Sequence, residues 1–300
     1  MSEYFLLNEV DLWAFTVLFV DLIVAVTLIV ALRFLFGLVA NVHTATELAE
    51  RDNFAFGISF SGGILAVALT LTGVLSGAAA PNLLIETLLV AAYGSLGLIL
   101  IKVGRLAQDK LVLTGIDLQA EIRKGNLSAA FVDLANILAT GLVLRAVMLW
   151  VENDSWGGLL VVILAFVFVQ LLLAAVTRVR LMIFEKRHPE GCLQEAFRSG
   201  NIAISLRYLG HLVGVALAMS AASGLIIYNP EELFAAVMGW LVATIFFSLM
   251  LSMLALFARK IILAGIDVVD EVDKQRNVAV GAIEGAIFIS IGLLMAALFS

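Results

Sequence analysis

Seven polar or ionisable residues stand inside long apolar stretches of this chain, where their side chains could bind or carry ions. They are Asp21, Asp133, Asn136, Gln170, Arg207, His211 and Glu284. The three carboxylates outnumber the one arginine, and histidine titrates near neutral pH, so the set could form an ion or proton path. Alternatively, Arg207 could pair with Asp133 or Glu284, and the other groups could form hydrogen bonds between helices. The sequence leaves both interpretations open.

Eight apolar stretches must position these residues. They cover residues 12–36, 54–79, 85–106, 127–151, 156–179, 202–227, 233–257 and 278–299. Each is long enough to cross a hydrocarbon core of about 30 Å as a helix. The chain has 62% hydrophobic and 14% charged residues, whereas soluble proteins have about 25% charged residues. The sequence therefore predicts an all-α fold, a polytopic membrane helix bundle of eight transmembrane helices without a separate soluble domain.

Lysine and arginine gather on one side of the predicted membrane. Of the 18 in the chain, 16 lie in or beside the four loops that follow the first, third, fifth and seventh stretches, and the other two, Arg145 and Arg207, lie inside stretches. Because basic loops stay in the cytoplasm, we expect these loops to be cytoplasmic and both termini to be non-cytoplasmic. The first stretch follows acidic residues without a basic leader, so we expect it to be retained as a helix.

Each of the four basic loops ends in an asparagine that opens the next apolar stretch. These residues, separated by 73, 75 and 76 positions, are Asn53, Asn126, Asn201 and Asn277. Such a regular period indicates internal duplication. An asparagine at a helix start caps free backbone N–H groups, which is the role that we predict, with direct ligand binding as the alternative. Asp133, Arg207 and Glu284 lie six or seven residues beyond these asparagines, and therefore at one depth.

A second, longer period relates the two halves of the chain. The sequence Gly115-Ile116-Asp117 with Glu121 recurs at an offset of 150 residues as Gly265-Ile266-Asp267 with Glu271. We therefore expect a tandem duplication, with a first membrane half at residues 1–150 (helices 1–4) and a second at 151–300 (helices 5–8). Because each unit holds two spans, the four units enter the membrane as parallel repeats. Residues 111–122 and 261–272 alternate apolar and acidic residues at helical spacing, which predicts cytoplasmic amphipathic helices that lie on the membrane surface or pack against the bundle.

Pairs of small residues four positions apart indicate close helix packing. They are Gly57/Ser61, Gly73/Gly77, Gly210/Gly214 and Gly281/Gly285. Small residues at this spacing let helix backbones approach closely in a membrane. Three of the pairs lie near capping asparagines, so we expect the even-numbered helices to form a packed inner layer, although some pairs could serve an interface between copies of the chain.

The asparagine motif places a basic residue shortly before an asparagine that opens a membrane helix with small and apolar residues. Carried in tandem helix-pair units with a charged loop before each, it resembles the bacterial family of the domain of unknown function 350, also called YjfL-like. The resemblance covers nearly the whole chain, which looks like a double-length form with four helix-pair units. It implies a helical protein of the bacterial inner membrane, linked to envelope stress, and it implies no established activity or catalytic residue.

We expect no enzymatic activity, no cofactor and no metal. The chain has no His-Glu-x-x-His, Gly-x-Ser-x-Gly or phosphate-loop motif. Its three histidines, His43, His188 and His211, are too scattered to indicate a zinc site. No cluster of basic and aromatic residues indicates binding of nucleic acid.

Two functions compete on this basis. The polar residues inside the spans favour a small-solute or ion transporter or channel that uses an intramembrane polar belt. The alternative is a non-transporting membrane scaffold whose acidic cytoplasmic loops recruit envelope-stress partners. Besides the lipid bilayer, the expected partners are a second copy of the chain and a cytoplasmic protein.

Overall fold

Eight long helices dominate the computed structural model, which describes residues 12–40, 43–77, 79–151 and 156–299. They are α1 (Leu12–Ala40), α2 (Phe54–Val74), α3 (Leu83–Ala107), α5 (Leu127–Trp150), α6 (Gly158–Arg187), α8 (Ile202–Leu225), α9 (Leu233–Ile262) and α10 (Val278–Leu298). All eight are long and apolar enough to cross a membrane, and the described residues form no β-strand. The predicted all-α membrane bundle is therefore confirmed.

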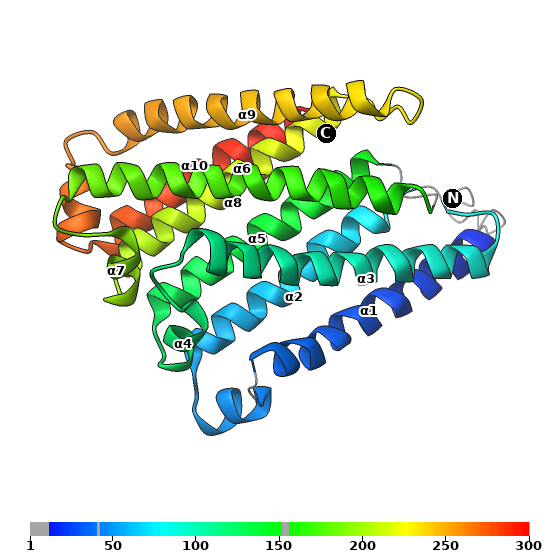
Figure 1. Ribbon diagram of the computed structural model, residues 1–300, viewed down its shortest axis with the longest axis horizontal. Coiled ribbons are helices and arrows are strands. Elements are labelled where there is room, and N and C mark those ends of the chain that lie inside the picture. Colours follow the sequence, from blue (N-terminus) through cyan, green and yellow to red (C-terminus); the bar gives the residue numbers. More distant parts are fainter. Residues whose placement is uncertain (1–11, 41–42, 78, 152–155, 300) are drawn as a thin grey trace, which may run out of the picture.

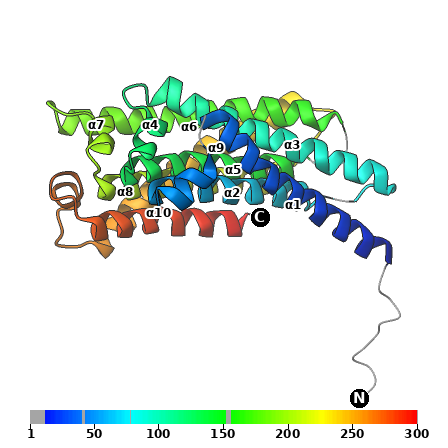
Figure 2. The same cartoon turned by 90° about the horizontal axis from the view of Figure 1, so that it is seen from below.

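The helices form two layers (Figure 1, Figure 2). The inner layer is a row in the order α2, α5, α8, α10, and the outer layer holds α1, α3, α6 and α9. Helix α3 lies over α2 and α5, α6 over α5 and α8, and α9 over α8 and α10. The second helix of every predicted pair thus belongs to the inner layer, as the spacing of small residues predicted.

Glycines let the inner helices approach closely. A Cβ atom at Gly141 on α5 would lie 2.8 Å from the Cα atom of Ala66 on α2. A Cβ atom at Gly214 on α8 would lie 2.7 Å from the carbonyl oxygen of Phe288 on α10. A larger residue at either position would push the backbones apart. Because lipid is as apolar as the helices, this close van der Waals contact is a main source of association between them.

The loop helices are shorter than the sequence predicted for residues 111–122 and 261–272. Helix α3 continues into the π-helical η3 (Gln108–Val112), and α4 (Leu118–Arg123) follows a turn. In the fourth repeat, α9 ends at Ile262 and η4 (Asp270–Lys274) follows a turn at Gly265, whose φ is +82°. Glycine ends a helix easily, and Asp117 and Asp267 accept the free N–H groups of the next helical turn.

The other two repeats hold η2 (Thr46–Glu50) and α7 (Leu193–Arg198) at the corresponding places. These short segments gather at one end of the bundle, the left in Figure 1, where all four capping asparagines lie. We call it the asparagine end. They pack on the bundle rather than standing free, since Leu118, Ile122, Phe197 and Val272 are all buried.

Candidate functional site

Each inner helix begins at its capping asparagine, as predicted. The four Oδ1 atoms accept backbone N–H groups of the first helical turn, from Phe56, Ala129, Ile204 and Val280. The Nδ2 groups of the first three reach the loop of the following repeat. They donate from Asn53 to Ile122 O at 3.0 Å, from Asn126 to Arg198 O at 3.0 Å and from Asn201 to Val272 O at 3.3 Å. The motif therefore also fastens each repeat to the next.

A glutamate accompanies the asparagine in three repeats. The Nδ2 group donates to Glu47 in the first repeat, to Glu121 in the second and to Glu271 in the fourth. The ammonium group of Lys124, 2.7 Å from Glu121 Oε1, and the Asn126 amide hold the pKa of Glu121 below its ordinary value. This shared contact gives Glu121 and Glu271, which recur at the 150-residue offset, the same role in both halves.

The first half of the bundle holds a buried ion pair. Asp133 on α5 is fully buried, and its carboxylate accepts Nε of Arg105 at 2.8 Å and Nη2 at 2.6 Å. Arg105 lies in the last turn of the outer helix α3. Ser59 on α2 donates a short hydrogen bond to the same carboxylate. The Asp133 carboxylate is thus engaged by a cation and a hydroxyl group from two other helices.

The second half repeats this arrangement with one difference. Glu284 on α10 is fully buried and accepts Nη1 of Arg259, in the last turn of α9, at 2.7 Å. His211 Nε2 and Arg207 Nη1 lie 3.8 and 3.9 Å from the Glu284 carboxylate, too far for hydrogen bonds. Instead, Arg207 donates to Asp273 in η4. This second cluster is therefore more loosely engaged than the first.

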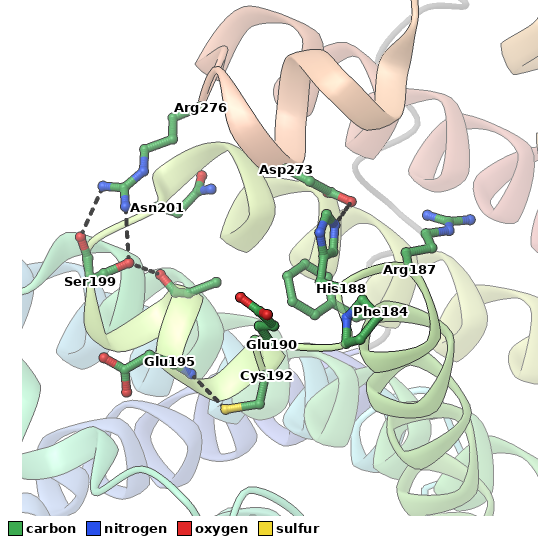
Figure 3. A pocket seen from close by; sticks show the side chains of 13 residues that line it. Phe184, Arg187, His188, Glu190, Cys192, Glu195, Ser199, Asn201, Asp273 and Arg276 are labelled. Atoms are coloured by element: carbon green, nitrogen blue, oxygen red, sulfur yellow. Dashed lines mark hydrogen bonds and ion pairs between the residues drawn. The ribbon is translucent and has the colours of Figure 1, made fainter.

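Asp273 connects the membrane cluster to the loops. Its buried carboxylate meets Arg207 on one oxygen and His188 Nε2, at 3.1 Å, on the other. His188 lines an open cleft of about 630 Å³ between the end of α6, α7 and η4. Figure 3 shows His188 pointing to Asp273 on one side of this cleft and Arg276 reaching Ser199 on the other. We call it the loop cleft.

A second cavity of about 490 Å³ lies between α6, α8, α9 and α10 and shares Phe184 and Arg187 with the loop cleft. Among the described residues, its walls carry one carboxylate, that of Glu284, and four guanidinium groups, those of Arg180, Arg187, Arg207 and Arg259. We call it the arginine cavity. Four positive charges against one negative leave an excess of three, and Asp273 beside Arg207 reduces it to two. Such a site attracts anions, because charges act strongly where water is scarce.

Several polar atoms in the walls have no hydrogen-bond partner among the described residues. They are Nε of Arg180, Nε2 of His211 and Oε2 of Glu284. The Arg180 guanidinium carbon lies 5.7 Å from the ring centroid of Phe288, within range of a cation–π contact. Each buried polar atom left unpaired costs about 1–3 kcal/mol. These walls therefore favour a polar occupant.

The arginine cavity is long and opens sideways. Along α6 its lining runs from Arg187 at the asparagine end to Leu172, fifteen residues deeper, or roughly 22 Å at about 1.5 Å per residue. The rim between α6 and α9 is apolar, with exposed side chains such as Val179 and Leu249. In a bilayer this rim faces the acyl chains.

Of the remaining predicted site residues, Asn136 contacts Tyr208, which lines the arginine cavity, and the others lie elsewhere. Asn136 accepts the hydroxyl of Tyr208 at 2.8 Å, and Gln170 donates to Thr140 at 3.2 Å. Asp21 on α1 is buried, and its Oδ1 has no hydrogen-bond partner among the described residues. The polar residues thus form separate clusters rather than one continuous belt, and of the predicted set only Arg207, His211 and Glu284 line the arginine cavity.

Sequence reasoning missed the partners of the two buried carboxylates. Charge counting places Arg105 and Arg259 in or beside the loops, yet the outer helices α3 and α9 continue past them. A signal was present in the spacing. Arg105 precedes Asp133 by 28 residues and Arg259 precedes Glu284 by 25, so both halves carry the same pair.

Fold and site together define a polytopic membrane protein of tandem helix-pair repeats. A family model described as Domain of Unknown Function (DUF350) matches residues 9–148 and again residues 154–299. The chain belongs to this family and is a double-length form of it, as the asparagine motif suggested. Neither the comparison with curated proteins nor that with solved structures gives a match.

Proposed function

We propose that this protein is a transporter of the bacterial inner membrane that binds an anionic group, a phosphate or carboxylate, in the arginine cavity. The observation that carries the proposal is the excess of guanidinium groups over carboxylates in the lining of this cavity. Guanidinium groups bind phosphate and carboxylate through paired N–H donors. Because the rim is apolar, the anion is either a small solute or the headgroup of a lipid.

The buried carboxylates support anion binding over cation binding. Asp133 is held by Arg105 and Ser59, and Glu284 by Arg259, so their negative charges are already compensated. Arg180 has no such partner among the described carboxylates and leaves its Nε unpaired. A cation entering the arginine cavity would meet net repulsion, whereas an anion would meet attraction.

The proposed orientation places the asparagine end in the cytoplasm. It rests on the 16 of 18 lysines and arginines in or beside the loops at that end. The arginine cavity reaches the asparagine end at Arg187 and ends near the middle of α6. A solute would therefore enter from the cytoplasmic side or from the inner leaflet.

The test uses purified protein in vesicles of phosphatidylcholine with two separate probes. One is uptake of labelled inorganic phosphate, and the other is transfer of fluorescent phosphatidylglycerol between leaflets, read by dithionite quenching. We expect one probe to move faster than in protein-free vesicles. Faster phosphate identifies a free anion as substrate, and faster phosphatidylglycerol identifies a lipid headgroup.

Two matched variants make the test specific. Arg180→Gln removes a cavity charge and should return the rate to that of protein-free vesicles. Arg178→Gln removes a charge two residues earlier on α6, outside the cavity lining, where the side chain donates to Leu111 O at 2.7 Å. It should keep the wild-type rate. The proposal fails if neither probe moves faster, or if Arg180→Gln transports as well as the wild type.

The alternative function is a scaffold that holds a protein partner at the asparagine end. The loop cleft favours it, because its wide opening carries charged groups of both signs, including Arg187, Glu190 and Arg276. A photo-crosslinking residue at Glu190 would then capture one discrete partner in cells, and capture would not depend on Arg180. An absence of any discrete product would remove this alternative.

A further inference from the structure

The inner row repeats one interface three times, at α2–α5, α5–α8 and α8–α10. Small residues recur two, nine and thirteen positions after each capping asparagine, and we call them the forward face. On the first three inner helices all of them are buried: Ala55, Gly62 and Ala66; Ser128, Ala135 and Ala139; Ala203, Gly210 and Gly214.

Contacts across the junctions share one register. The forward position nine meets position eight of the next helix, as Gly62 meets Leu134 and Gly210 meets Gly285. Forward position thirteen meets position fifteen, as Ala66 meets Gly141 and Gly214 meets Gly292. Forward position two meets position four, as Ser128 meets Ser205 and Ala203 meets Gly281. The junctions are therefore copies of one packing arrangement.

Helix α10 carries the same forward face, and none of the described residues packs against it. Ala279, Ala286 and Ser290 lie two, nine and thirteen positions after Asn277, and all three are exposed. Helix α10 thus keeps small residues at the positions that are buried in every preceding repeat. Small side chains gain little by facing lipid, whereas they permit close approach of another helix.

Positions four, eight and fifteen after a capping asparagine are those that the forward face of the preceding helix contacts, and we call them the receiving positions. Helix α2, at the other edge of the row, leaves them open. Position eight is Ser61, which is exposed. Positions four and fifteen, Gly57 and Ala68, are half-buried, while their counterparts on α5, α8 and α10 are all buried. A Cβ atom at Gly57 would lie 3.8 Å from Leu48, an ordinary van der Waals distance, so there is room for a side chain.

The fastening asparagines end in the same asymmetric way. Asn53, Asn126 and Asn201 each donate to a carbonyl of the following loop, whereas Asn277 donates to Glu271 and meets no such carbonyl among the described residues. Conversely, Leu48 lies five residues before Asn53, as Val272 lies five before Asn277. The Leu48 carbonyl is the counterpart of the Val272 carbonyl, which accepts from Asn201. No asparagine motif precedes Leu48 in the given sequence.

The outer helix α1 is also incomplete. Each other outer helix lies over a groove between two inner helices, whereas α1 packs on one inner helix, α2, and on its outer neighbour α3. Consistently, α1 is the least buried of the eight spans, and side chains such as Leu18, Leu22 and Val26 are exposed.

We propose that copies of this chain associate head to tail, with α10 of one copy packed against α1 and α2 of the next in the register of the internal junctions. Asn277 then donates to the Leu48 carbonyl of the next copy, and α1 of that copy covers the groove between the two inner helices. The occupant of the α10 face is a second copy because the contact continues an interface present three times within each chain. Such an interface closes into a ring or extends as a filament.

Disulfide trapping in membranes tests the proposed register. In a Cys192→Ser background, Ala286→Cys and Ser61→Cys place cysteines at forward position nine and receiving position eight. Within one chain these positions lie at opposite edges of the row, so any disulfide joins two copies. After oxidation, the double variant should give a ladder of dimers, trimers and larger species, while a mixture of the two single variants should stop at dimers.

Leu254→Cys combined with Ser61→Cys is the matched control, because Leu254 is exposed on α9, eight residues from the end of that helix nearest the asparagines. It should give no ladder. Dimers from Ala286→Cys alone would overturn the proposal, since they require a two-fold contact.

Light scattering in detergent provides an independent measurement. The wild type should be larger than a monomer, and Ala286→Leu should be a monomer of unchanged helix content. A monomeric wild type without disulfides would show that lipid covers both faces.

Discussion

Replacing Asp133 with asparagine tests whether the ion pair of the first half holds the bundle together. The carboxylate is fully buried and accepts two N–H groups of Arg105 at 2.8 and 2.6 Å, while the Arg105 side chain is 11% exposed. Asparagine has the same shape but no charge, and its NH2 group cannot accept either donor. The buried guanidinium then loses the carboxylate that accepts two of its N–H groups, which should lower the free energy of unfolding by about 3–5 kcal/mol.

The assay is unfolding by dodecyl sulfate in mixed micelles, followed by circular dichroism. Glu195→Gln is the control, because its pair with Arg198 at 2.8 Å is solvent-exposed, with side chains 59% and 47% accessible. It should cost less than about 1 kcal/mol. Arg105→Met combined with Asp133→Leu should recover much of the loss, since no charge is then left unpaired. A loss for Asp133→Asn no larger than for Glu195→Gln would refute the reasoning.

Three further predictions concern the repeats. Because Lys124 and Asn126 hold the pKa of Glu121 below its ordinary 4.5, its charge stabilises the folded chain above that pH and loses this effect as pH falls through the lowered pKa. The difference in melting temperature between wild type and Glu121→Gln should accordingly shrink on acidification. Asn126→Ala removes a cap and a link to the next repeat and should cost about 1–3 kcal/mol. In the Ala286→Leu background, which should be monomeric in detergent, Asn277→Ala should cost less than Asn126→Ala, and equal losses would count against the link. Gly214→Ala would place a Cβ atom 2.7 Å from a backbone oxygen of α10, so the melting temperature of this variant should be clearly below that of the wild type. An unchanged melting temperature would disprove the close contact.

The architecture was predictable from sequence because it depends on local patterns. Apolar stretches of about 20 residues specify spans directly. The asparagines mark helix starts, and their spacing reveals the repeats. Small residues at Gly210 and Gly285 predicted the inner layer, since only a neighbouring backbone explains their size.

The candidate site was less predictable because it depends on contacts between distant segments. Charge counting placed Arg180 and Arg259 in or beside the loops, although both helices extend beyond the apolar core and carry these side chains inward. No sequence pattern marked Asp273, which the fold buries against Arg207. The excess of positive charge in the cavity thus arises from residues that no local pattern associates.

Binding of an anion to the purified full-length protein tests the central claim most directly. Melting temperature is measured in a neutral detergent while inorganic phosphate, phosphatidylglycerol or, as a neutral comparison, phosphatidylcholine is added. The arginine cavity predicts that phosphate or phosphatidylglycerol raises the melting temperature of the wild type and of Arg178→Gln but not that of Arg180→Gln. An equal rise in Arg180→Gln, or no rise with either anion, would contradict it.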